Sequence, residues 1–107
     1  MHRSTWKAVE RRWATRIGGE RVPITGRQRG SAPDIAHDRL SVEVKSGKTI
    51  STRQQTAMEQ AEASKRGDQV PVVLLTHMRA GNKGNVEAIM FEKEAGLHVL
   101  RLAGLID

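Results

Sequence analysis

Apolar residues recur at helical spacing near the start of the chain and form one stripe of a predicted helix. The members of this stripe are Trp6, Val9, Trp13 and Ile17. Ser4 or Thr5 offers a hydroxyl that can cap the first turn, and the glycine pair at 18–19 can end the last one. The pattern therefore predicts a helix that runs to about Ile17.

Glu10 lies within the apolar stripe of this predicted helix. At about 100° per residue it falls about 40° from Trp6. The polar positions that point away are Lys7, Arg11, Arg12 and Thr15. An ionised acid on the buried side is destabilising unless it is paired or bound to a cation. We therefore expect either a basic side chain or a metal ion beside Glu10.

Period-two alternation marks residues 40–45, LSVEVK, as a strand with two different faces. One face carries Leu40, Val42 and Val44, and the other carries Ser41, Glu43 and Lys45. Residues 34–45 are predicted to form two strands with a turn at 37–39. An earlier short strand is predicted at 20–24, where Pro23 favours a sheet edge or a break.

The second half of the chain is predicted to contain one helix and further strands. Capping-box spacing is found for Ser51 with Gln54 and for Thr52 with Gln55, and Gly67 can stop the helix that follows, over 52–66. The β-branched run at 70–77 favours a strand covered on both faces. Residues 86–91 predict another strand, and alternation over 97–102 predicts a last one.

Length and element order together indicate the fold class. A chain of 107 residues is long enough for one compact domain, predicted over residues 1–107. The element order is αβββαβ with one or two further strands, which indicates an α/β (α+β) fold. We expect no cofactor of the nucleotide class, because no Walker loop is present.

Charge favours a nucleic-acid partner. Eighteen Lys and Arg against twelve Asp and Glu give a net charge of +6 and a pI of about 10.5, above the level of about 9 at which nucleic-acid binding becomes a serious expectation. The alternative is a basic surface that only maintains solubility. The start of the chain has no signal-peptide pattern, and no run of roughly 20 apolar residues is present. We therefore expect no membrane partner and a cytoplasmic location.

Two acids on the predicted hairpin indicate a metal site. If the turn holds an even number of residues, Asp34 lies across from Glu43, with Cβ atoms about 5 Å apart. Such carboxylates repel each other unless a cation lies between them. With no cysteine and no clustered histidine, hard oxygen ligands favour Mg²⁺, or Mn²⁺. The Val44 carbonyl can add a ligand, while Lys45 can steady a phosphate, orient a water or act as a general base.

Pro33, Asp34, Glu43 and Lys45, in PDIAHDRLSVEVK, match the PD-(D/E)xK nuclease pattern. More narrowly, the chain resembles Holliday junction resolvases of the archaeal type and their small bacteriophage relatives. The resemblance covers residues 4 to about 77. It implies a restriction-endonuclease-like core, in which a central mixed sheet is flanked by helices. It also implies Mg²⁺-dependent hydrolysis of DNA phosphodiester bonds by a homodimer that cuts two strands of a branched, four-way junction.

The resemblance also implies roles for three residues outside the hairpin. Glu10 matches the glutamate of the family's first helix, which makes it a metal ligand, directly or through water. Thr25 takes the place of the usual serine after the first strand, and Gln55 matches a glutamine in the helix after the lysine, although Gln54 is an alternative. Thr25 can also simply start a turn, and Gln55 can also simply cap its helix.

Basic residues in predicted loops are candidates for contacts with DNA phosphates. They are Arg27, Arg29, Lys48, Arg79 and Lys83. For each of them, plain solvation is the alternative.

Alternative functions use the same site or none. A restriction-like, repair or nicking endonuclease would have the same residues, and a basic DNA-binding module would not cleave. Compact size and the resemblance suggest a bacteriophage origin, with the protein in the host cytoplasm, and a role in DNA recombination and repair.

Overall fold

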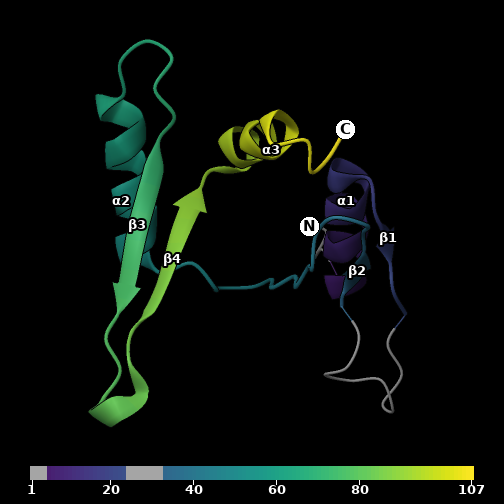
Figure 1. Cartoon of the computed structure of the whole chain (residues 1–107), viewed down its shortest axis with the longest axis horizontal. Helices are drawn as coiled ribbons and strands as arrows, with labels where there is room; N and C mark the ends of the chain where they lie inside the picture. Colours follow the sequence, from purple (N-terminus) through teal and green to yellow (C-terminus); the bar gives the residue numbers. More distant parts are fainter. Residues whose placement is uncertain (1–4, 24–32) are drawn as a thin grey trace. The chain divides into compact units, whose positions relative to one another are not determined.

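The computed structural model describes residues 5–23 and 33–107, and within them it has three α-helices and two antiparallel two-stranded sheets (Figure 1). The mixed α and β class predicted from the sequence is confirmed. The chain groups into two compact units, Met1–Thr49 with Val99–Asp107, and Ile50–His98. None of the helices in the described ranges combines the length and apolar character of a membrane span.

Helix α1 (Trp6–Ile17) has the boundaries that its sequence predicts. The Thr5 hydroxyl accepts a hydrogen bond from the Ala8 N–H at 3.1 Å, and Gly18 ends the helix in the left-handed conformation at φ 76°. Ile17 is buried, but Trp6 is 54% exposed. The predicted apolar stripe is therefore buried only toward the C-terminal end of the helix.

Three short segments form a ribbon beside α1, which we define as residues 20–22, 34–36 and 42–44. Strands β1 (Glu20–Arg21) and β2 (Ile35–Ala36) are antiparallel, and a single bridge joins Ile35 to Val42 on the other side. Ile35, in the middle segment, is fully buried. The predicted strand at 20–24 is shortened to Glu20–Arg21 and ends ahead of Pro23, which has no N–H to donate. Of the two strands predicted within 34–45, the first is reduced to Ile35–Ala36, and the second is wrong, since that segment has a single bridge at Val42.

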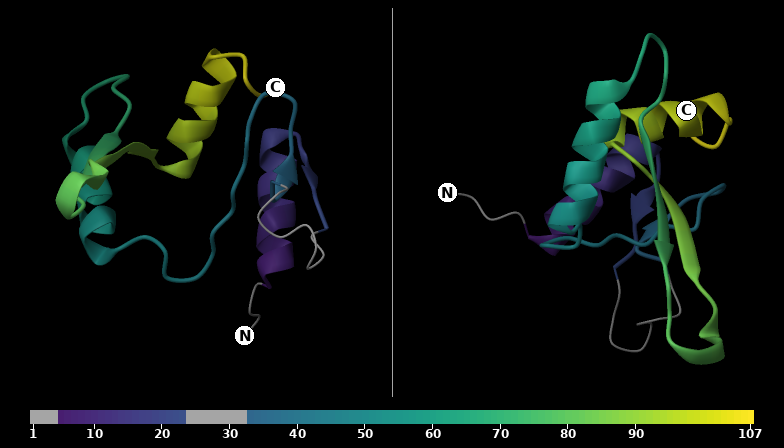
Figure 2. Two further views of the ribbon diagram at one scale, coloured as in Figure 1. Left: turned by 60° about the horizontal axis from the view of Figure 1, so that its bottom comes forward. Right: turned by 90° about the vertical axis from the view of Figure 1, so that its left-hand side faces the viewer.

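The second unit pairs a helix with a hairpin. Helix α2 (Thr52–Ser64) begins with the predicted capping box of Ser51 and Gln54. It packs on β3 (Val72–His77), which pairs along its whole length with β4 (Val86–Phe91) (Figures 1 and 2). A short 3₁₀ turn, η1 (Gly81–Lys83), lies between the two strands.

The prediction that residues 70–77 are covered on both faces is wrong. Val73 is buried, but Leu74 is 74% exposed and its cross-strand partner Ile89 is 64% exposed. Successive strand residues point to opposite faces, and α2 packs on one face of a two-stranded sheet. The run of consecutive apolar residues therefore places apolar side chains on an exposed face as well.

The predicted last strand at 97–102 is also wrong, because these residues belong to helix α3 (Lys93–Leu102). The Glu92 carboxylate accepts hydrogen bonds from the N–H groups of Glu94 at 2.9 Å and Ala95 at 3.3 Å. The bond from Glu94 is the main cause that lowers the pKa of Glu92 below its usual value. This cap satisfies N–H groups of the first turn that would otherwise lack a partner, and so favours a helix over a strand.

Gly19 provides a test of the contact between the end of α1 and the ribbon. A Cβ atom there would lie 2.6 Å from the Ala36 carbonyl oxygen and 2.7 Å from Ile35 Cγ2. We expect Gly19→Ala to lower the free energy of unfolding by about 2 kcal/mol or more. Gly18→Asn is the control, since Gly18 has open space around it and Asn tolerates positive φ, and it should cost less than about 1 kcal/mol. Urea denaturation measures both, and equal losses would contradict the proposed contact.

Candidate active site

Asp34 is held by hydrogen bonds on both sides of its strand. Its carbonyl oxygen accepts from the Val22 N–H at 3.0 Å, and its own N–H donates to the Val42 carbonyl at 3.1 Å. Its carboxylate oxygen Oδ2 accepts from the Val44 N–H at 2.7 Å. The half-buried Asp34 side chain is therefore fixed against the backbone of Val44.

Residues 40–45 have the two faces that the alternation predicts. Leu40, Val42 and Val44 are half-buried, and Ser41, Glu43 and Lys45 are exposed. Because Val44 lies between Glu43 and Lys45, the Asp34 carboxylate lies against the backbone of the segment that carries these two residues.

The pairing of Asp34 with Glu43 is less regular than the prediction. The bridge between Ile35 and Val42 has the expected register. If this pairing continued by one residue, Asp34 would lie opposite Glu43. The Asp34 N–H donates to Val42 instead of continuing the ladder. Asp34 is thus drawn toward Val44 by its side chain.

Glu10 has an arginine as its cation. Its Oε1 lies 2.7 Å from Arg21 Nε, and the side chains of Glu10 and Arg21 are only 8% and 15% exposed. The Arg21 guanidinium also lies 5.1 Å from the ring centre of Trp6, within the range of a cation–π contact. The arginine partner, which was the alternative to a metal ion for this buried acid, is therefore present.

Glu10 and Asp34 are connected to the ribbon in different ways. Arg21 pairs with Ile35, so its side chain lies on the ribbon face that is buried against α1, whereas Asp34 is the next residue along the strand. Within residues 5–23 and 33–107, no three His, Cys, Asp or Glu side chains gather closely enough to hold a metal ion. The structure brings Asp34 to Val44 and does not bring Glu10 into the same group.

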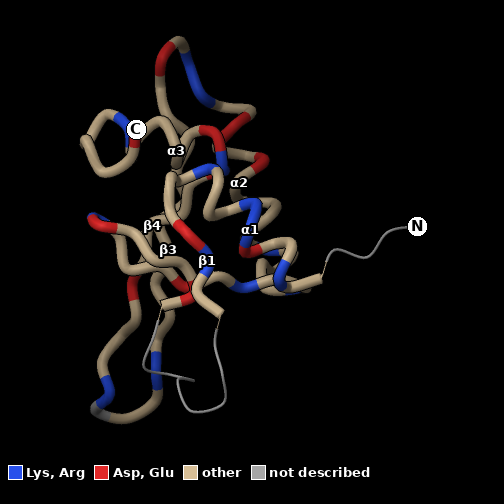
Figure 3. Tube along the Cα trace, turned by 90° about the vertical axis from the view of Figure 1, so that its right-hand side faces the viewer, with Lys and Arg blue, Asp and Glu red and all other residues tan. Residues whose placement is uncertain are grey.

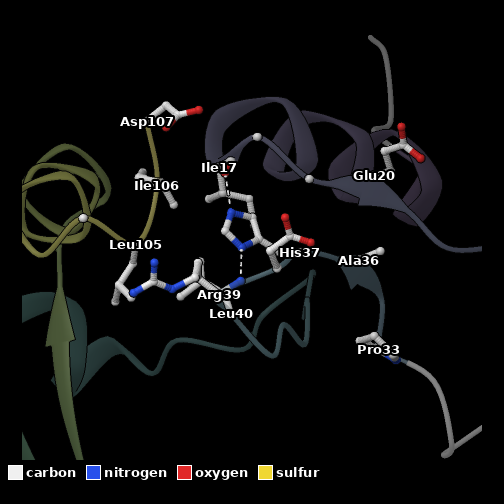
Figure 4. A pocket seen from close by; sticks show the side chains of 14 residues that line it. Ile17, Glu20, Pro33, Ala36, His37, Arg39, Leu40, Leu105, Ile106 and Asp107 are labelled. Carbon is white, nitrogen blue, oxygen red and sulfur yellow. Dashed lines mark hydrogen bonds between the residues drawn. The ribbon is translucent and has the colours of Figure 1, made fainter.

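His37 has a structural role that the sequence pattern did not indicate. It lines a depression of about 800 Å³ beside the end of α1 (Figure 4). The Arg39 N–H donates to His37 Nδ1 at 3.0 Å, and Nε2 lies 2.9 Å from the Ile17 carbonyl oxygen. Since Nδ1 accepts, Nε2 carries the proton and donates to Ile17. One imidazole therefore joins the helix end to the turn that precedes the Glu43 segment.

The remaining predicted site residues fall in several places. Thr25, Arg27 and Arg29 lie outside the described residues. Lys48 is exposed in the first unit. Gln55 belongs to the second unit, where its side-chain amide donates to the Ile50 carbonyl at 2.9 Å. This bond fits the simpler alternative for Gln55, a contact at the start of its own helix.

The two basic candidates near η1 also belong to the second unit. The Arg79 guanidinium donates to the carbonyl oxygens of Gly84, at 3.0 Å, and Lys83. The Lys83 side chain is exposed. Arg79 therefore stabilises the turn between β3 and β4 and has fewer N–H groups left for a phosphate than an exposed, unbonded arginine would have.

Comparison with protein-family models, with curated proteins and with solved structures gives no match to this chain. The function is therefore argued from the chemistry of the site.

The ion pair of Glu10 and Arg21 can be tested by stability measurements. Arg21→Gln leaves a buried carboxylate without its cation, so we expect it to lower the free energy of unfolding by about 3 kcal/mol. The double variant Glu10→Gln/Arg21→Gln removes both charges and should lose at least about 1 kcal/mol less. Chemical denaturation at neutral pH gives both values. If the double variant were as unstable as Arg21→Gln, the buried charge would not be the cause.

Proposed function

We propose that this protein is a metal-dependent DNA endonuclease of the PD-(D/E)xK type. The observation that carries the proposal is the 2.7 Å hydrogen bond from the Val44 N–H to Asp34 Oδ2. It holds one carboxylate against the residue that separates Glu43 from Lys45. Two acids can hold a divalent ion beside a phosphodiester, and a lysine next to them can stabilise charge on the phosphate.

The donor set fits a hard divalent cation. Asp34 Oδ1 accepts no hydrogen bond from the described residues, and Glu43 is exposed on the neighbouring segment. Together with the Val44 carbonyl, these oxygens would hold Mg²⁺ or Mn²⁺. When bound, such an ion acts as a Lewis acid on a phosphoryl oxygen and lowers the pKa of a water ligand.

The protein's own residues supply position and charge. Lys45 follows Glu43 by two residues and is exposed like it, so both side chains lie on one face of the segment. Its ammonium can neutralise charge that develops on the phosphate or orient the attacking water, and the alternative role for Lys45 is that of a general base. The net charge of +6 draws a polyanion toward the acidic site.

In the proposed enzyme, Glu10 is connected to the candidate site through the ribbon. Its carboxylate is connected to β1 by Arg21, and a role toward the metal requires a bridging water or exchange of its Arg21 partner. Thr25 and Gln55 would assist as contacts to the phosphate or the water.

The finer parts of the proposal follow from the resemblance. They are a restriction-endonuclease-like core with one mixed sheet, a homodimer, a four-way DNA junction as the preferred substrate and a cytoplasmic location. A homodimer would provide two active sites, as the cutting of two strands requires.

Cleavage of labelled DNA tests the chemistry. With Mg²⁺ we expect the wild-type protein to cut a synthetic four-way junction, and Asp34→Asn, Glu43→Gln and Lys45→Ala each to cut at least about a hundredfold more slowly. Asp34→Asn keeps an oxygen that can accept the Val44 N–H, so loss of activity would report loss of charge. Asp38→Asn, which removes an exposed acid four residues away, should cut normally.

Other outcomes separate the alternatives. Preferential cutting of linear duplex at one sequence would favour a restriction-like enzyme, and single-strand breaks would favour a nicking or repair enzyme. A basic DNA-binding module that does not cleave is the remaining alternative. DNA binding without metal-dependent products on any substrate would support it and overturn the endonuclease.

Metal binding can be measured without DNA. We expect Mn²⁺ to bind the wild-type protein, as followed by electron paramagnetic resonance, and Asp34→Asn or Glu43→Gln to weaken binding at least about tenfold, because each removes a charged ligand. Glu10→Gln/Arg21→Gln keeps the charges of Asp34 and Glu43, so its affinity reports the part of Glu10. Wild-type affinity in Asp34→Asn would contradict the proposed ligand set.

A further inference from the structure

Helix α1 presents the basic side chains of Lys7 and Arg11 on its solvent side. Its charged residues are Lys7, Glu10, Arg11, Arg12 and Arg16. Figure 3 shows basic positions along α1 and acidic colour among them. That acid, Glu10, is buried and bound to Arg21 of β1. The acid of the helix is therefore paired within the protein, and Lys7 and Arg11 lie at the surface.

Lys7 and Arg11 lie together on this surface. They are four residues apart, which puts them one turn apart along the axis, at a rise of about 6 Å. Both are exposed, and neither forms an ion pair with a carboxylate of the described ranges. The Lys7 ammonium lies 5.5 Å from the ring centre of the half-exposed Trp6. Two neighbouring cations on a rigid helix form a surface suited to an anionic partner.

The chemistry of the helix favours DNA over a lipid surface. A basic helix that lies on a membrane inserts its apolar side into the lipid. In α1 the apolar side is buried within the protein at Ala14 and Ile17, and Gly19, just after the helix, touches β2, so Trp6 is the one large apolar side chain of this helix that is mostly exposed. The rest of the exposed flank carries Lys7 and Arg11, and phosphates spaced along a DNA strand complement charges repeated along a helix.

We propose that Lys7 and Arg11 form a phosphate-binding surface, which contacts the DNA backbone outside the metal site and independently of base sequence. The identity of the ligand rests on the proposed function. The contact itself does not require catalysis, because it uses neither Asp34 nor the Glu43 segment. Helix α1 would thus contribute to the affinity for the substrate in addition to the basic loops.

Binding without cleavage tests this surface. Affinity of the full chain for a labelled duplex is measured by fluorescence anisotropy in EDTA, over a range of salt concentrations. The test variant is Lys7→Gln/Arg11→Gln, and Gln is about as good a helix former as Lys and Arg. The matched control is Lys65→Gln/Lys93→Gln, whose lysines pair with Glu62 and Glu94. Each double variant removes two of the six net positive charges.

We expect the salt dependence to identify the phosphate contacts. Each lost phosphate contact lowers the slope of log K against log salt by about 0.9, so the α1 variant should lose about 2 units of slope and bind at least about tenfold more weakly at low salt. The loss should be the same for duplexes of different sequence, because backbone contacts carry no sequence information. The control variant should keep most of the slope.

The outcomes distinguish the two proposals. Equal losses in the α1 variant and the control, no loss in either, or no DNA binding by the wild-type protein would overturn the surface on α1. If the α1 variant loses binding as expected while the wild-type protein cuts no DNA in Mg²⁺, the DNA-binding surface on α1 is supported and the endonuclease proposal is rejected. If the wild-type protein cuts DNA but the α1 variant binds like the control, the endonuclease proposal is supported and the surface on α1 is rejected.

Discussion

The hydrogen bonds of Asp34 are the constraint on which the candidate site depends. One residue joins β1 through its carbonyl, the neighbouring segment through its N–H, and the backbone of Val44 through its carboxylate. The side chain thus has a structural partner as well as a chemical role. A carboxylate that is already oriented loses less conformational freedom when a cation binds, which is the usual advantage of a preorganised ligand.

Charge is distributed over this unit according to burial. The buried acid of α1 is neutralised by Arg21, which packs against Trp6 as well. Within the part of the chain that the structure describes, the exposed acid Glu43 and the half-buried Asp34 form no ion pair with a basic side chain. Negative charge is therefore compensated where water is excluded and left available at the candidate site, beside a strongly basic helix.

Local signals in the sequence predicted local structure well. The Thr5 cap, the Gly18 terminus, the capping box at Ser51 and the alternating burial over 40–45 all depend on contacts within a few residues. The sequence also indicated that Glu10 needs a cation. It could not select Arg21 over a metal ion, because that choice depends on how β1 pairs with a segment more than ten residues away.

The wrong predictions share a physical cause. Six residues with alternating apolar positions fit both a strand and a helix, and at 97–102 the preceding Glu92 cap decides for the helix. The exposure of Leu74 depends on how many helices cover the sheet, which no local pattern encodes. Sequence spacing assigned Asp34 to the candidate site. The hydrogen bond between its carboxylate and Val44 depends on the tertiary structure, which the spacing does not show.

The imidazole of His37 has a mechanical consequence. It joins the last turn of α1 to Arg39, in the turn that fixes where residues 42–44 meet β2. The ring therefore ties the position of the helix end to that of the turn from which the Glu43 segment leaves.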